Sequence, residues 1–155
     1  VPMRAEASDK SEMVNQLLFG EIFKVLAVDK QWRQIELSHD SYIGWIDEKQ
    51  YKEISRQEHA QLLEGTKHYV SDLLQPIFNQ GQQFLIPMGS VLYELQNEVS
   101  STIAKEMYTF YGETQIADKQ RYITKNALVT HALKYLRTPY LWGGLSALGL
   151  SLIHI

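Results

Sequence analysis

Apolar and polar residues alternate over the first fifty positions in a pattern that predicts short β-strands. Residues 21–28 alternate along one predicted strand, and residues 32–37 and 41–46 give two further apolar runs. A polar turn, Ser38-His39-Asp40, separates the last two runs. Several short strands joined by turns are typical of a small barrel or sandwich.

A second strand-rich block is predicted from residue 68 to residue 118. Its clearest apolar runs lie within residues 84–95, and residues 102–111 alternate as one more strand. Pro87 lies inside an apolar run. Because proline cannot donate a hydrogen bond to a neighbouring strand, Pro87 predicts an edge strand or a bulge. The polar stretch at residues 55–64 suits a linker or a short surface helix.

The pattern then changes to helical spacing. Apolar side chains recur at Leu128, Ala132 and Leu136, as on one face of a helix. Thr124 or Asn126 can cap the helix start, and Pro139 ends it. The predicted fold class is therefore mainly β, with two β blocks followed by one helix and an irregular tail.

Composition narrows the function classes. The chain has 155 residues, 45% of them hydrophobic, so it can bury a core, and its net charge of -3 does not favour nucleic acid. No run of eighteen apolar residues exists, so no membrane span is predicted. With no cysteine and only scattered histidines, the sequence predicts no disulfide, thiol nucleophile, metal site or cofactor.

Thr138-Pro139-Tyr140-Leu141-Trp142-Gly143-Gly144 resembles the entry to the catalytic domain of NlpC-type cysteine peptidases, which cut peptidoglycan peptides. In that family the run continues roughly as Gly-Arg-Ser-Pro-Phe-Gly-Ile-Asp-Cys-Ser-Gly. Here the cysteine position is Leu152, and the position of the preceding aspartate is Ser151. We therefore expect no catalytic residue in this chain and a sequence truncated before the catalytic cysteine.

Tyr42-Ile43-Gly44-Trp45-Ile46 is similar to a motif of bacterial SH3-like domains, with Ser41 in place of the usual turn glycine. We expect Trp45 to fill the small core of such a domain. Tyr42 and Gly44 point to the same side of a strand, so the glycine is expected to leave room for a ligand beside the Tyr42 ring.

Together these stretches resemble the γ-D-glutamyl-L-diamino acid endopeptidases, which carry SH3-like domains before an NlpC-type catalytic domain. The resemblance implies two tandem bacterial SH3-like barrels and the first helix of a truncated α+β papain-like domain. The implied boundaries are a first SH3-like domain at 1–53, a linker at 54–67, a second SH3-like domain at 68–118, and the start of the peptidase domain at 119–155.

The resemblance also implies a ligand. In this family the substrate is a murein peptide with a free N-terminal L-alanine, whose ammonium group is held by acidic groups and a tyrosine. Tyr42 and Glu6 are the candidates carried over, and Glu12 is the runner-up to Glu6. A carboxylate and a phenol oxygen together satisfy an ammonium donor. Murein recycling in the bacterial cytoplasm is favoured over the periplasm or cell surface.

Two functions remain open. The chain is either the recognition portion of a cell-wall peptide hydrolase, inactive as given, or a free-standing tandem SH3-like module. Such a module would bind cell-wall peptide or a protein partner, including a proline-rich one. In either case we expect the apolar face of the predicted helix to be buried against another surface. We expect it to dock on the second block or to form a homodimer through Leu128, Leu133 and Tyr135.

Overall fold

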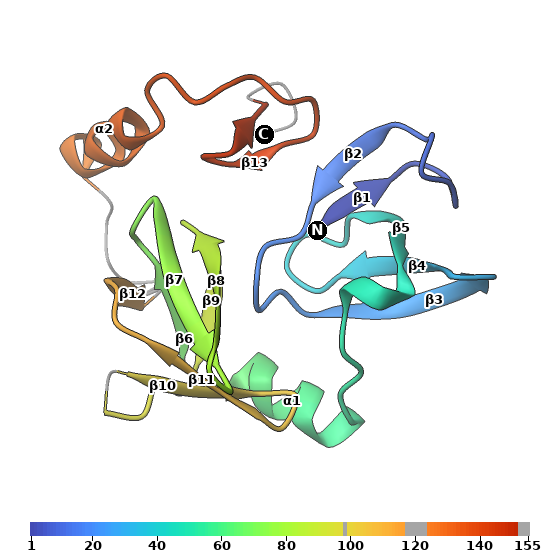
Figure 1. Cartoon of the computed structure of the whole chain (residues 1–155), viewed down its shortest axis with the longest axis horizontal. Helices are drawn as coiled ribbons and strands as arrows, with labels where there is room; N and C mark the ends of the chain where they lie inside the picture. The colour runs from blue at the N-terminus through green and yellow to red at the C-terminus, as the bar shows by residue number, and fades with distance from the viewer. Residues whose placement is uncertain (98, 117–123, 152–155) are drawn as a thin grey trace.

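The computed structural model describes residues 1–97, 99–116 and 124–151, and it has two β blocks side by side (Figure 1). A helix, α1 (Arg56–Glu64), links the blocks. A second helix, α2 (Lys125–Lys134), and a short hairpin follow them. The mainly β class predicted from the sequence is confirmed.

The first block is a five-stranded antiparallel sheet in the order β2-β1-β5-β4-β3. Its buried core consists of Met3, Leu17, Ile35, Leu37 and Ile46. The elements are β1 (Pro2–Arg4), β2 (Met13–Gln16), β3 (Phe23–Asp29), β4 (Trp32–Leu37), β5 (Ile43–Asp47) and the short 3-10 helix η1 (Glu48–Gln50). The three strands predicted within residues 21–46 are thus present, with slightly different ends.

Two details of the first block differ from expectation. Trp45 is only half-buried, whereas Trp32 is buried, so the tryptophan of the motif does not fill the core. The space beside Gly44 is not free for a ligand either. A Cβ atom at residue 44 would lie 2.4 Å from Cγ of Met3, a side chain with no exposed surface. The glycine admits a core methionine.

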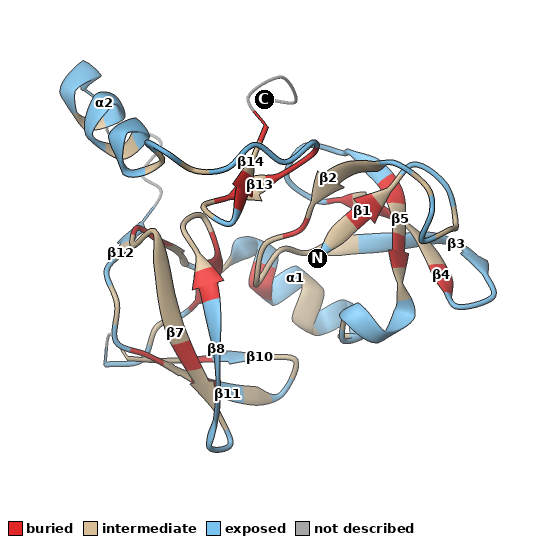
Figure 2. Ribbon diagram, turned by 45° about the horizontal axis from the view of Figure 1, so that its top comes forward, coloured by how far each residue is buried: buried red, intermediate tan, exposed pale blue. Residues whose placement is uncertain are grey.

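The second block contains two small antiparallel sheets, in the orders β10-β11-β7-β8 and β12-β6-β9. Buried residues line their shared interior in Figure 2, and they include Ile77, Ile86, Leu92 and Phe110. The strands are β6 (Lys67–Val70), β7 (Leu74–Asn79), β8 (Gln82–Pro87), β9 (Val91–Tyr93), β10 (Ser100–Ile103), β11 (Glu106–Phe110) and β12 (Thr114–Ile116).

The prediction of one strand over residues 102–111 is wrong, because the chain turns in the middle of it. β10 and β11 pair as a hairpin through Ala104 and Lys105, both with positive φ (52° and 62°). Two positive φ values suit a two-residue hairpin turn, but Ala and Lys carry no sequence signal for one. The prediction for Pro87 is confirmed, since β8 is the edge strand of its sheet.

Both helices begin at capping side chains. The Ser55 hydroxyl accepts the N–H of Glu58 at the start of α1, and Thr124 Oγ1 accepts the N–H of Ala127 at the start of α2. The polar stretch between the blocks is therefore a short helix, and Thr124 rather than Asn126 caps the later one. No helix in the described residues is long and apolar enough to cross a membrane.

A short loop between β2 and β3 holds the blocks together. Phe19 packs on the second core, with ring centroids 5.1 Å from Tyr108 and 5.7 Å from Phe84. The Phe19 carbonyl accepts the N–H of Val91 at 2.8 Å. Gly20 lies against the same strand, and its carbonyl accepts the hydroxyl of Tyr93 at 2.8 Å. The first block is thus anchored in the core of the second.

The sequence predicts an irregular tail after the helix, and the described part of the tail contradicts that prediction. It forms a two-stranded hairpin, β13 (Leu145–Ser146) and β14 (Gly149–Leu150). The Trp-Gly-Gly stretch packs against β2. A Cβ atom at Gly143 would lie 2.5 Å from the carbonyl oxygen of Met13, and one at Gly144 would lie 2.3 Å from that of Gly149. Two glycines allow this close approach of three backbone segments.

Candidate functional site

Tyr42 lies just before β5, on the exposed side of the first block. Ser41 precedes it with φ of 60°, the conformation expected of the usual turn glycine. The N–H of Tyr42 donates to Asp40 Oδ1 at 2.9 Å, and its carbonyl accepts the N–H of Leu37. The hydroxyl lies 3.4 Å from the carbonyl oxygen of Val14 in β2. The backbone is therefore fixed while the phenol remains accessible.

Glu12 directly precedes β2 and lies two residues before Val14 in the chain. Its Oε1 accepts the indole N–H of Trp142 at 2.5 Å. Gln16, the last residue of β2, accepts the N–H of Leu145 at 2.8 Å through its Oε1. The tail thus contacts both β2 and the residue before it, Glu12, and the Tyr42 hydroxyl lies beside the same strand. We call Tyr42, Glu12 and Trp142 the β2 surface.

Glu6 is less well placed. It lies in the loop after β1, is exposed, and its backbone N–H donates to the Ser11 hydroxyl at 2.9 Å. Glu12, which ranked second in the sequence analysis, contacts the tail directly. Ser151, at the position of the family's aspartate, is fully buried and donates its N–H to the carbonyl of Gly144. Leu152, at the cysteine position, lies outside the described residues.

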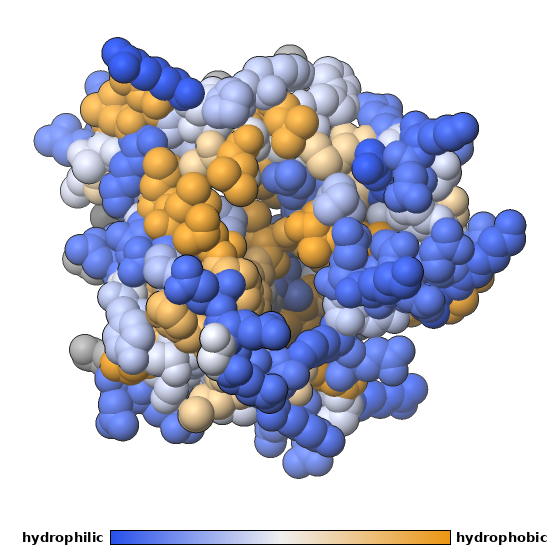
Figure 3. All heavy atoms as spheres, in the orientation of Figure 1, coloured by the Kyte–Doolittle hydropathy of each residue, from blue (hydrophilic) through white to orange (hydrophobic). Residues whose placement is uncertain are grey.

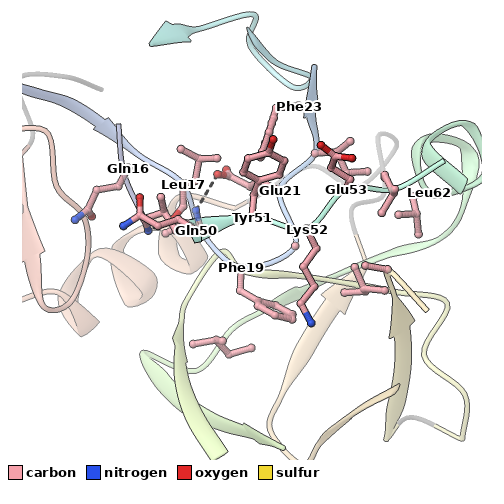
Figure 4. Close-up of a pocket in the computed structure, with 18 of the residues that line it drawn as sticks. Gln16, Leu17, Phe19, Glu21, Phe23, Gln50, Tyr51, Lys52, Glu53 and Leu62 are labelled. Atoms are coloured by element: carbon pink, nitrogen blue, oxygen red, sulfur yellow. Dashed lines mark hydrogen bonds between the residues drawn. The ribbon is translucent and has the colours of Figure 1, made fainter. Parts of the chain in front are cut away.

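A large cavity of about 1210 Å³ lies between the two blocks, and Tyr42, Glu6 and Glu12 do not line it. Figure 3 shows it as a hollow with apolar walls. We call it the inter-block cavity. In the close-up, Phe19 and Lys52 point toward the second block, and Phe23, Tyr51 and Leu62 lie around them (Figure 4). No sequence pattern pointed to this cavity, because it forms between segments far apart in the chain.

Charged groups shape the cavity wall. Lys52 forms an ion pair with Glu106 of the second block, and Glu106 also accepts the hydroxyl of Tyr108 at 2.8 Å. The hydrogen bond from Lys52 and that from Tyr108 lower the pKa of the Glu106 carboxyl. Burial, together with this hydrogen bond, raises the pKa of Tyr108 to about 12. The phenol is thus neutral at physiological pH and remains a donor.

Glu21 is the partly buried carboxyl of the cavity. Its Oε2 accepts the N–H of Leu18 at 2.8 Å, and His39 lies 3.8 Å from its Oε1. Desolvation by burial raises the pKa of this carboxyl above 4.5, against the opposing effects of that hydrogen bond and of His39. The folded state therefore binds this proton more tightly than the unfolded state does.

This raised pKa gives a prediction for Glu21→Gln. The stabilisation from a protonated Glu21 is complete below about pH 4.5 and is lost as the pH rises through the raised folded-state pKa. Gln keeps an oxygen for the Leu18 N–H but does not titrate. We therefore expect the variant to gain stability relative to the parent between pH 4 and pH 7, measured by urea unfolding. An equal difference in unfolding free energy at both pH values would contradict this expectation.

The apolar face of α2 is exposed in this chain. Leu128 and Leu133 have exposed fractions of 57% and 60%, and Tyr135 is partly buried. The helix contacts the second block through Lys134, whose Nζ donates to the carbonyl of Ser71 at 2.9 Å. Homodimerisation through this face stays a prediction.

Comparisons with known proteins agree with the sequence motifs. Residues 3–50 match the family described as the bacterial dipeptidyl-peptidase SH3 domain. Most of the fold is similar to a solved NlpC/P60 family protein from Bacillus cereus, with a TM-score of 0.73 and 17% sequence identity. That alignment covers 88% of this chain and 50% of the Bacillus protein. A search of curated protein sequences finds no match.

The family match contains the Tyr42 motif and Glu12, which the sequence analysis had already singled out. The sequence points to Trp142 only as part of the stretch that resembles NlpC-type peptidases, and it does not predict the contact of Trp142 with Glu12. Residues 3–50 are therefore similar to the bacterial dipeptidyl-peptidase SH3 domain, in a chain whose fold resembles about half of a solved NlpC/P60 family protein.

Proposed function

We propose that this chain is the recognition portion of a cell-wall peptidase and binds a murein peptide by its free N-terminal L-alanine. The observation that carries the proposal is the β2 surface, where a carboxylate and an accessible phenol lie beside the Trp-Gly-Gly stretch. The chain contributes binding and not chemistry, since its 155 residues include no cysteine to act as a thiol nucleophile. The bond cleaved by the complete enzyme is the γ-D-Glu–diamino acid bond.

The β2 surface suits an ammonium ligand. One oxygen of the Glu12 carboxylate accepts the Trp142 indole N–H, and the carboxylate has further lone pairs that can accept a second donor. The Tyr42 hydroxyl can give its proton to the Val14 carbonyl, which leaves its own lone pairs facing outward. An ammonium group between them would gain charge-assisted hydrogen bonds, which are about twice as strong as neutral ones.

Tyr42→Phe tests the phenol. We expect the variant to bind L-Ala-γ-D-Glu-diaminopimelate about tenfold more weakly or worse, because a hydrogen bond to a charged group contributes about 1.5–3 kcal/mol. Titration calorimetry on the 155-residue chain measures this loss. Glu12→Gln should weaken binding similarly, since Gln still accepts the Trp142 indole but carries no charge.

Two controls accompany this experiment. The same tripeptide with an acetylated N-terminus has no ammonium group, so it should bind the parent and Tyr42→Phe equally weakly. Glu48→Gln removes an exposed carboxylate that pairs with Arg33 elsewhere on the first block, and it should leave binding unchanged. Equal affinity of the parent for the free and acetylated peptides would refute recognition of the ammonium group.

A further inference from the structure

The inter-block cavity has no role in the function proposed above. Its walls carry aromatic and aliphatic side chains from both blocks, among them Phe19, Phe23, Phe84 and Leu85. Two of these remain considerably exposed, Phe84 at 41% and Leu85 at 59%. Apolar surface that stays open to water in a hollow of about 1210 Å³ marks an interaction site.

Two open sheet edges line this cavity. β3 is the outer strand of the first sheet and β8 that of the four-stranded sheet, and among the described residues no strand pairs with the outer side of either. Residues 23–25 of β3 and residues 84–87 of β8 belong to the cavity wall. An open edge presents unpaired backbone N–H and C=O groups, to which an extended peptide can add as a further strand.

The register of β8 shows which of its backbone groups are free. β7 and β8 form a hairpin in which Asn79 pairs with Gln82 around Gln80 and Gly81, both with positive φ. The pair flanking a two-residue turn is hydrogen-bonded, and such pairs alternate with non-bonded ones. Counting back, Leu85 opposite Pro76 is a non-bonded pair. Pro76 has no N–H to donate, which agrees with this count.

The N–H and C=O of Leu85 therefore point away from β7, toward the open edge. Pro87, two residues later, also belongs to a non-bonded pair, so its missing N–H removes no hydrogen bond between β7 and β8. The edge offers a donor and an acceptor at Leu85, at the middle of the stretch that lines the cavity. This is the hydrogen-bonding pattern that a strand-adding ligand needs.

The charges of the lining favour an acidic ligand. Four lining side chains are cationic, Lys24, Lys49, Lys52 and Arg56, against two carboxylates, Glu21 and Glu53, although the whole chain has a net charge of -3. Lys52 is already paired with Glu106, so three cations remain in the lining against its two carboxylates. His59 Nε2, also in the lining, is buried with no hydrogen-bond partner among the described residues. It can serve a polar group of the ligand.

We propose that the inter-block cavity binds an extended peptide segment of another protein, apolar at alternate positions and carrying an acidic residue. The segment adds antiparallel or parallel to the open edge of β8 and hydrogen-bonds to Leu85. Its apolar side chains enter the aromatic walls, and its carboxylate meets the basic side chains at the rim. This site is separate from the β2 surface and independent of murein binding.

Fluorescence anisotropy with the 155-residue chain tests the proposal. The probes are fluorescein-labelled Val-Thr-Phe-Thr-Val-Asp and its two analogues with Val or Leu in place of Phe. We expect saturable binding by at least one of them, and binding about tenfold weaker for the same peptide with N-methylated backbone amides, because lost main-chain hydrogen bonds leave buried carbonyls unpaired. Replacing the Asp by Lys should also weaken binding.

Leu85→Pro removes the outward N–H without breaking a bond to β7, and we expect about tenfold weaker binding. Leu85→Val keeps that N–H and is the matched control. Tyr42→Phe should leave peptide binding unchanged, so failure here and failure of murein recognition are distinguishable. Absence of binding by all three probes up to about 1 mM would overturn the proposal. So would equal binding of the N-methylated peptide, or a dimer of this chain that Leu85→Pro abolishes.

Discussion

Gly20→Ala is expected to separate the two β blocks. Gly20 has φ of 82°, and a Cβ atom there would lie 1.9 Å from the carbonyl oxygen of Val91. A side chain at positive φ costs about 1–2 kcal/mol, and the collision with a backbone atom adds about 1–3 kcal/mol. The added methyl group must therefore push the loop away from β9 and withdraw Phe19 from the second core.

The hydrogen bond from Val91 to Phe19 reports this separation. Its amide should lose most of its protection from hydrogen exchange in the variant, while Ile77 in the centre of the second block keeps its protection. Gly81→Ala is the matched control, since Gly81 has nearly the same φ of 80° but no atom within 4 Å of the position that an added methyl group would take. Equal effects of the two substitutions would mean that the contact with Val91 contributes nothing.

Local features of the fold could be predicted from the sequence. The start of α2 followed from Thr124 and the apolar spacing after it, since a cap and a helix face are set by neighbouring residues. Pro87 marked an edge strand because a missing N–H is a local property. The turn at Ala104 and Lys105 was missed, because neither residue type favours positive φ and the sheet imposes it.

The candidate site was only partly predictable. Tyr42 and Glu12 could be chosen by motif and charge, but the partner of Glu12 is Trp142, 130 residues away in the chain. No periodicity links residues so far apart. In the sequence, the two glycines after Trp142 indicate only the resemblance to NlpC-type peptidases. In the structure they allow close backbone packing against β2 and β14. The inter-block cavity was missed for the same reason, since Phe19 of one block completes the core of the other.

Gly44→Ala tests which neighbour requires a glycine in the Tyr42 motif. A methyl group at residue 44 would lie 2.4 Å from Cγ and 2.5 Å from Sδ of Met3. Met3 has no exposed surface and is enclosed by Leu17, Ile35 and Ile46, so it has little space into which to move. Overpacking of this kind costs about 1–3 kcal/mol, and urea unfolding of the chain should show a loss of that size.

Met3→Ala supplies the compensating change. Alone, it leaves a cavity and should cost about 2–5 kcal/mol. In the double variant the methyl group introduced by Gly44→Ala occupies part of that cavity. The combined loss should therefore be smaller than the sum of the single losses by about 1 kcal/mol or more. Strictly additive losses would mean that the two residues do not share the space.

The same variants separate core packing from ligand binding at this motif. If Gly44 exists to admit Met3, then Gly44→Ala lowers stability, and the loss in the double variant is smaller than the sum of the two single losses. If the glycine left room for a ligand instead, Gly44→Ala would abolish tripeptide binding at unchanged stability, and Met3→Ala would restore nothing. The contact with Met3 favours the first outcome, in which the motif fixes the backbone that carries Tyr42.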